Sequence, residues 1–187
     1  MKRLAAISLI LFAVPAGAAE LSSEYTKLDH QTDCHVIGKS DGEGDWADLV
    51  CPGYGNYPYF IRSGDGRETV TYGFATDSGM PSFGPFNYSN GTVEWRLAAE
   101  NGAKRPLAAI QRWYIADPEG NWTTQILVVS KVGQPDGGGA CVMGYVTAAD
   151  GAAANERARA LSDRAADFEC GDEISVEAPL RDLVPRQ

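Results

Sequence analysis

Cys141-Val-Met-Gly-Tyr-Val-Thr147 and the residues that follow it to Cys170 are the part of the sequence on which the predicted fold most depends. The first seven residues have the composition of a strand. In the segment that follows, apolar residues recur with a 4-3-4-3 spacing at Ala154, Ala158, Leu161, Ala165 and Phe168. This spacing places them on one face of a helix, and charged residues occupy the other face. Because most of the buried positions are alanines, the helix can lie close to a flat surface but contributes little apolar area.

Upstream of this segment, short stretches with strand patterns alternate with turn signals. Val93, Trp95 and Leu97 alternate with charged residues, which is typical of a strand with one buried face. The apolar run at 126–129 predicts a central strand buried on both faces. Turns such as Ser63-Gly-Asp-Gly66 connect neighbouring strands as hairpins. We therefore predict an α+β fold: an antiparallel sheet of about seven or eight short hairpin-connected strands, with one C-terminal helix packed on it and two disulfides.

The N-terminus has the pattern of a secretory signal peptide. A basic pair and a short apolar run precede small residues at positions 16–19. The apolar run is shorter than the roughly 20 residues that span a bilayer, which disfavours a retained membrane anchor. We predict that residues 1–19 are removed on export and that residues 20–170 form a single α+β domain. Residues 171–187 are expected to form a polar, frayed C-terminal tail. The expected location is the periplasm or the extracellular medium.

The cysteine content supports the same compartment. The sequence contains four cysteines, an even number that in an oxidising compartment indicates disulfides. Three pairings are possible in principle. We favour Cys34–Cys51 and Cys141–Cys170, because each pair encloses a compact segment that is local in sequence. Metal ligation is disfavoured, since no C-x-x-C or H-x-x-x-H spacing occurs.

The charge balance narrows the classes of partner. The chain has 25 acidic and 16 basic residues, a net charge of −9 at pH 7. An acidic chain is repelled by nucleic acid and by anionic lipid surfaces, so we expect neither as a partner. Acidity is also common in exported proteins simply because it favours solubility. No P-loop, dinucleotide-binding glycine pattern or zinc-protease motif is present, and we predict no cofactor.

Two sequence patterns resemble catalytic or metal sites. Gly38-Lys-Ser-Asp-Gly42 matches the G-x-S-x-G motif of hydrolases, but both His30 and His35 precede it and the sequence after it predicts a loop instead of a helix. The alternating carboxylates that include Asp41 and Asp45 resemble the start of a calcium-binding loop but lack its glycine and its final glutamate. We therefore predict neither a nucleophilic serine nor a metal here.

Aromatic residues in two loops rich in Gly and Pro, 52–58 and 76–91, are the best candidates for a binding surface. Rigid aromatic side chains on loops are enriched at interfaces because they bury a large area at low entropic cost. The alternative is that these side chains fold back and cover the ends of the sheet. The candidate partner-binding residues are Tyr54, Tyr57, Ser78, Phe83, Phe86 and Tyr88.

Four segments resemble a family of small exported proteobacterial proteins of no assigned activity. These segments are Cys51-Pro-Gly-Tyr54, Val93-Glu-Trp-Arg-Leu97, Ile126-Leu-Val-Val129 and the stretch from Cys141 to Cys170. The resemblance implies a compartment and a fold rather than an activity. More loosely, Ser78-Gly79 and the aromatic-rich sequence through Tyr88 resemble the periplasmic lysozyme inhibitors, in which a Ser-Gly loop that ends in Tyr enters an enzyme cleft.

The sequence therefore predicts a non-enzymatic exported binding or structural module of the cell envelope. Its expected partner is another envelope protein or a secreted hydrolase. One alternative is an inhibitor of an envelope-degrading hydrolase that acts through the 76–91 loop. Another is a small secreted hydrolase that uses carboxylates near Asp41 and Asp45.

Overall fold

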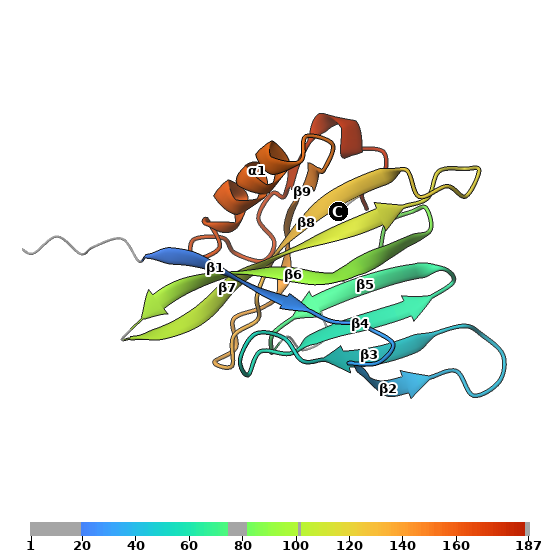
Figure 1. The fold of residues 1–187 in the computed structure, drawn as a ribbon, viewed down its shortest axis with the longest axis horizontal. Helices are drawn as coiled ribbons and strands as arrows, with labels where there is room; N and C mark the ends of the chain where they lie inside the picture. Colours follow the sequence, from blue (N-terminus) through green and yellow to red (C-terminus); the bar gives the residue numbers. More distant parts are fainter. Residues whose placement is uncertain (1–19, 75–81, 101, 186–187) are drawn as a thin grey trace, which may run out of the picture.

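The computed structural model describes residues 20–74, 82–100 and 102–185 (Figure 1). The predicted signal peptide and Ser78 lie outside the described residues. The described chain forms ten strands, one α-helix and one short 3₁₀ helix. Their bounds are β1 Leu21–Lys27, β2 His35–Lys39, β3 Ala47–Cys51, β4 Tyr59–Gly64, β5 Arg67–Tyr72, β6 Asn87–Glu100, β7 Ala103–Ile115, β8 Thr124–Lys131, β9 Cys141–Thr147, α1 Ala152–Ser162, β10 Ser175–Val176 and η1 Ala178–Leu180.

The strands form two sheets where the sequence predicted one. The larger sheet has the order β1-β6-β7-β8-β9-β10, and the smaller sheet has the order β2-β3-β4-β5. Neighbouring strands are antiparallel except for β10, which pairs with β9 in parallel. The predicted α+β class is confirmed.

The two sheets and the helix form three layers, with the larger sheet in the middle (Figure 1). The alternation in β6 assigns its two faces. Val93, Trp95 and Leu97 lie in the core between the sheets, whereas Glu94 and Arg96 pair with charged residues at α1. One face of the larger sheet therefore packs on the smaller sheet, and the opposite face carries the helix.

The helix is shorter than its periodic sequence predicts. It ends at Ser162, after which backbone bonds of the i to i+3 type continue the chain as turns. Ala165 and Phe168 are nevertheless buried in the same cluster as Ala154 and Ala158, as the 4-3-4-3 spacing predicts. The apolar face therefore packs on the sheet although only its first part is helical.

Both predicted disulfides are present, Cys34–Cys51 and Cys141–Cys170. The first joins the residue before β2 to the end of β3, and the second joins the start of β9 to the segment that follows α1. Disulfides are typical of proteins that fold in an oxidising compartment. In the described part of the chain, no helix has the length and apolar character needed to cross a membrane.

The sequence predicted a frayed C-terminal tail, but residues of this segment pair with β9 and pack into the core. Ser175–Val176 pairs with β9, and Leu180 is buried in the core between the sheets. Gly144 makes the pairing possible, because a Cβ at this position would lie 2.3 Å from the carbonyl oxygen of Ser175. The polar composition of the segment does not reveal this, since strand pairing uses backbone groups that every residue carries.

Candidate functional site

Aromatic side chains from β6, β7 and the loop after β7 form an exposed group on the larger sheet, which we call the aromatic cluster (Tyr88, Tyr114 and Trp122). Tyr88 and Tyr114 lie directly opposite each other in the β6–β7 pairing. Their rings stack with centroids 4.9 Å apart and an interplanar angle of 19°. Trp122 contacts Tyr88 edge-to-face with centroids 4.8 Å apart. Tyr88 is 38% exposed and Trp122 is 45% exposed, so the cluster is ordered by its own contacts and still accessible.

The cluster belongs to the face of the larger sheet that also carries α1. In β7, Trp113 and Ile115 lie in the core between the sheets. Tyr114, between them, therefore points to the opposite face, because successive side chains of a strand alternate. Ile110, four residues earlier on that face, packs in the same hydrophobic cluster as the helix. The aromatic cluster thus lies on the part of this face beyond the residues that contact the helix.

Polar groups, which include the charged guanidinium of Arg112, adjoin the aromatic cluster. Gln125 lies opposite Tyr114 in the β7–β8 pairing, and its amide oxygen accepts a hydrogen bond of 2.9 Å from Arg112. The amide of Asn90 donates to the Tyr114 hydroxyl at 3.3 Å. A shallow hollow of about 380 Å³ begins at Gln125. It is lined by Thr123, Thr124, Gln125, Thr147, Ala148 and Ala149. We call it the threonine hollow.

The loop that carries Trp122 is ordered by a carboxylate. Asp117 accepts hydrogen bonds from the backbone N–H of Asn121 at 2.7 Å and from its side-chain amide. The bond from the backbone N–H of Asn121 is the main reason that the pKa of Asp117 lies below its ordinary value of 3.8. The carboxylate therefore stays ionised at neutral pH and holds the turn immediately before Trp122.

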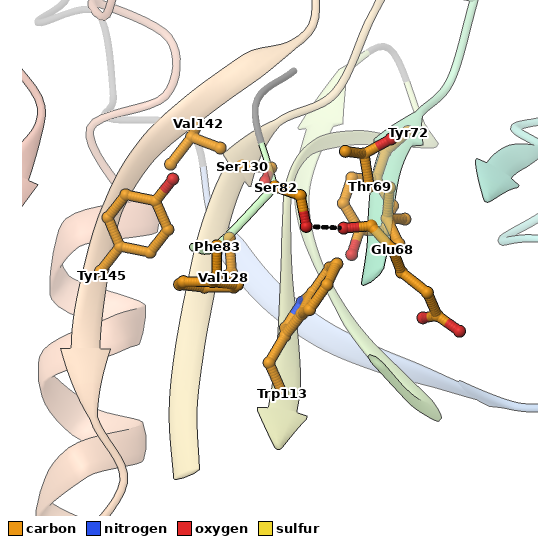
Figure 2. Close-up of a pocket in the computed structure, with 11 residues that line it drawn as sticks. Glu68, Thr69, Tyr72, Ser82, Phe83, Trp113, Val128, Ser130, Val142 and Tyr145 are labelled. Atoms are coloured by element: carbon orange, nitrogen blue, oxygen red, sulfur yellow. Dashed lines mark hydrogen bonds between the residues drawn. The ribbon is translucent and has the colours of Figure 1, made fainter. Parts of the chain in front are cut away.

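The structure separates the aromatic residues that the sequence predicted to share one surface. Phe83 is buried: its side chain is 4% exposed and packs against Trp113 and Tyr145 in the core (Figure 2). Its apolar ring fills space between the sheets, which is the fold-back alternative considered for these loops.

The remaining predicted aromatics occupy different places. Tyr54 and Tyr57 are half-buried against the core, and the Tyr57 hydroxyl donates to Gln134 at 3.1 Å. Phe86 is exposed, with the guanidinium of Arg67 5.1 Å from its ring centroid. Of the predicted residues that the structure describes, Tyr88 alone belongs to the aromatic cluster.

Sequence reasoning missed Tyr114 and Trp122. Trp122 follows the turn at 118–121, and a large aromatic side chain directly after a turn was an available signal. Tyr114 has no such signal, because its partnership with Tyr88 depends on strand register. The register shifts between Ser89 and Val93, so counting residues along β6 does not reveal it.

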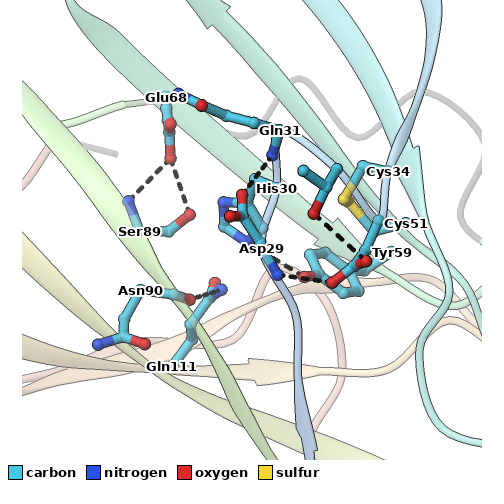
Figure 3. Close-up of a disulfide and its surroundings, with 12 residues drawn as sticks. Asp29, His30, Gln31, Cys34, Cys51, Tyr59, Glu68, Ser89, Asn90 and Gln111 are labelled. Atoms are coloured by element: carbon cyan, nitrogen blue, oxygen red, sulfur yellow. Dashed lines mark hydrogen bonds between the residues drawn. A yellow bond between two sulfur atoms is a disulfide. The ribbon is translucent and has the colours of Figure 1, made fainter.

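A chain of hydrogen bonds connects the aromatic cluster to the interior, and Figure 3 shows the bond in it between Gln111 and Asn90. The Tyr72 hydroxyl donates to the side-chain oxygen of Gln111 at 2.5 Å. The amide of Gln111 donates to the backbone oxygen of Asn90 at 2.6 Å, and the side chain of Asn90 in turn bonds Tyr114. Buried polar groups that are satisfied in this way fix the geometry of their surroundings. The chain therefore positions Tyr114 relative to the core.

Near the Cys34–Cys51 disulfide, titratable groups have structural partners (Figure 3). A ring nitrogen of His30 lies 3.1 Å from the Tyr59 hydroxyl, and burial lowers the pKa of His30 below 6.5. The carboxylate of Glu68 accepts hydrogen bonds from the backbone N–H and the hydroxyl of Ser89 at 2.8 and 2.7 Å. These contacts join the 29–33 loop to the smaller sheet, and the start of β5 to β6.

The residues of the acidic loop also make local contacts. The Ser40 hydroxyl donates to the backbone oxygen of Glu43 at 3.1 Å. The carboxylate of Asp45 accepts from the backbone N–H of Asp65 at 2.9 Å, which links the β2–β3 loop to the β4–β5 turn. In the described ranges, no group of three or more His, Cys, Asp or Glu side chains has a metal-binding arrangement.

No family model, curated protein or solved structure matches this chain significantly. The two resemblances noted in the sequence therefore stay predictions, and the functional argument depends on the geometry of the aromatic cluster and the threonine hollow.

Proposed function

We propose that this protein is an exported, non-enzymatic binding module that holds a neutral carbohydrate of the cell envelope on the aromatic cluster. The observation that carries the proposal is the accessible aromatic cluster beside the threonine hollow, in which Tyr88 stacks on Tyr114 and contacts Trp122 edge-to-face. The predicted signal peptide and the two disulfides support an envelope or extracellular location.

The aromatic rings supply the apolar half of such a site. Exposed apolar surface that is rimmed by polar groups commonly marks a binding site. Tyr88 and Trp122 contact each other before any ligand arrives, so little side-chain entropy is lost on binding. Sugar rings present patches of C–H groups that pack against aromatic rings, and their hydroxyl groups remain free at the edges.

The hollow supplies the polar half. Its lining of threonine hydroxyls, one glutamine amide and two alanines carries no formal charge. Hydroxyl and amide groups donate and accept hydrogen bonds, as sugar hydroxyls require. The net charge of −9 disfavours a polyanionic ligand. A neutral saccharide matches the aromatic rings, the polar lining and the charge.

Binding to immobilised neutral oligosaccharides tests the proposal. The probes are oligomers of glucose and of N-acetylglucosamine, and the protein is the oxidised chain without residues 1–19. We expect Trp122→Ala and Tyr88→Ala each to weaken binding at least tenfold, as removal of an aromatic anchor does, or about 1.4 kcal/mol. The matched control is Trp46→Ala, because Trp46 is similarly exposed but lies in the β2–β3 loop of the smaller sheet.

Two results would contradict the proposal. One is saccharide binding that Trp46→Ala weakens as much as Trp122→Ala, and the other is no saccharide binding at all. Capture of a secreted hydrolase together with the second result favours the inhibitor hypothesis. Hydrolysis of the bound oligosaccharide that is lost in Asp41→Asn or Asp45→Asn favours the enzyme hypothesis.

A further inference from the structure

Large apolar side chains are exposed at β2, the outer strand of the smaller sheet. Figure 1 shows β2 on the side of this sheet that faces away from the larger sheet. Among the described residues, β2 pairs with β3 on one side and with no strand on the other. Val36 is 57% exposed and Ile37 is 61% exposed. β2 is therefore an open sheet edge that presents apolar surface, and it lies in a different sheet from the aromatic cluster.

Val36 continues a row of core residues out to this edge. It lies opposite Leu49, which in turn lies opposite Ile61 of β4. Ile61 lies opposite Val70 of β5. Ile61 and Val70 are fully buried, and Leu49 packs against the same core. Because residues that pair directly share one face of a sheet, the apolar face that is covered at β4 and β5 is uncovered at Val36.

Trp46 enlarges the apolar surface beside β2. It is the last residue of the β2–β3 loop and is 47% exposed. Its ring lies against β2, since a Cβ at Gly38 would be 3.4 Å from Trp46 Cζ3. We call Val36, Ile37 and Trp46 the β2 patch. Exposed aromatic side chains bury a large area on binding, so Trp46 is the main anchor that the patch offers.

Carboxylates border the β2 patch at both ends. They lie in the loop before β2 and in the β2–β3 loop, and all are exposed: Asp29, Asp33, Asp41, Glu43 and Asp45. Lys39 is the only lysine or arginine between the first and the last of them. The hydrogen bonds that Asp29, Asp33 and Asp45 accept from backbone N–H groups leave their negative charge in place. The surface therefore combines an apolar centre with a negatively charged border.

We propose that the β2 patch is a docking site for a cationic, apolar segment of a partner protein. The apolar side chains of this segment cover Val36, Ile37 and Trp46, and its lysine or arginine side chains lie beside the carboxylates. The register shift between Val36 and Gly38 interrupts the open edge, so side chains contribute more to this contact than backbone pairing does. A second copy of the chain fits poorly, because it brings the same carboxylates and a net charge of −9 to the interface.

Nuclear magnetic resonance titrations with defined peptides test the proposal. The protein is the oxidised, ¹⁵N-labelled chain without residues 1–19, and the probe is a short peptide of alternating lysine and valine. A peptide of alternating glutamate and valine is the charge control. We expect the lysine peptide to shift the amide signals of β2 and the β2–β3 loop and to bind at least tenfold more tightly than the glutamate peptide. Equal binding of the two peptides, shifts confined to other elements, or no shifts would overturn the proposal.

Variants then locate the contact. We expect Trp46→Ala to weaken binding of the lysine peptide at least tenfold, and Asp41→Asn combined with Glu43→Gln to weaken it several-fold. Trp122→Ala is the matched control, because Trp122 is similarly exposed but belongs to the larger sheet. Equal losses in Trp46→Ala and Trp122→Ala would overturn the proposal. Concentration-dependent dimerisation that Ile37→Lys abolishes would also overturn it, since the patch would then bind a second copy.

Discussion

Replacement of Arg159 by methionine tests whether charge, more than apolar area, holds α1 on the larger sheet. The Arg159 side chain donates to both carboxylate oxygens of Glu94, at 2.6 and 3.2 Å. The Glu94 side chain is only 9% exposed and also accepts a hydrogen bond from Ser23 at 2.6 Å. The apolar contribution of the helix is small, because Ala154 and Ala158 are its buried apolar residues.

The magnitude follows from what the substitution removes. Hydrogen bonds to a charged group contribute about 1.5–3 kcal/mol to stability. Breaking a fully buried ion pair costs about 3–5 kcal/mol. Arg159 is 36% exposed, so water can replace part of the hydrogen bonding that Glu94 loses in the variant. The range for hydrogen bonds to a charged group therefore applies, and the higher range for a fully buried ion pair does not. We therefore expect a loss of about 2–3 kcal/mol. For a domain of this size, that loss lowers the midpoint of thermal unfolding by about 4–12 °C.

Urea denaturation of a double-mutant cycle measures the interaction itself. The cycle contains Arg159→Met, Glu94→Gln and the double variant, and we expect a coupling energy above about 1 kcal/mol. Lys104→Met is the control, because the Lys104–Glu24 pair is roughly half exposed at both ends and exposed ion pairs contribute little to stability. A coupling energy below about 0.5 kcal/mol would refute the reasoning and assign the helix contact to packing and the disulfide.

The same pair predicts a pH dependence. Burial opposes ionisation of Glu94, but the hydrogen bonds from Arg159 and Ser23 outweigh it and lower the pKa of Glu94 below its ordinary value of 4.5. A carboxyl group whose pKa is lower in the folded state stabilises the protein above its unfolded pKa. This contribution is lost as the pH falls below about 4.5 and through the folded pKa. Arg159→Met should show less of this loss than the wild type.

Three further predictions concern other contacts. Replacing Cys141 and Cys170 by serine opens a loop with a sequence separation of 29 residues and should cost about 3–4 kcal/mol in urea denaturation; an unchanged stability would contradict the chain-entropy estimate. Burial lowers the pKa of His30 below 6.5, so the free energy of unfolding should fall as the pH drops below about 6.5 and toward the folded pKa. His30→Gln should lack this component, and identical pH profiles would argue against it. Gly144→Ala places a methyl group 2.3 Å from the Ser175 backbone oxygen and should cost about 1–3 kcal/mol and expose the C-terminal segment to limited proteolysis; resistance equal to the wild type would refute this placement.

Much of the fold follows from local patterns in the sequence. The 4-3-4-3 spacing from Ala154 to Phe168 identifies the face that packs on the sheet, because side chains at this period share one side of a helix. The alternation at Val93, Trp95 and Leu97 identifies the core-facing side of β6 for a similar reason. The two disulfides also follow, since each encloses a segment that is compact by itself.

The candidate site depends on contacts that these patterns do not encode. The alternation of apolar and polar residues shows that a strand has a buried face. The same pattern occurs in strands of the larger sheet and of the smaller sheet, so it does not reveal which sheet a strand joins. Phe83 and Tyr88 both lie in the 76–91 loop predicted from sequence, yet one fills the core and the other lies beside Tyr114. Their difference arises from strand register and from the space between the sheets, which exist only after residues distant in sequence have paired.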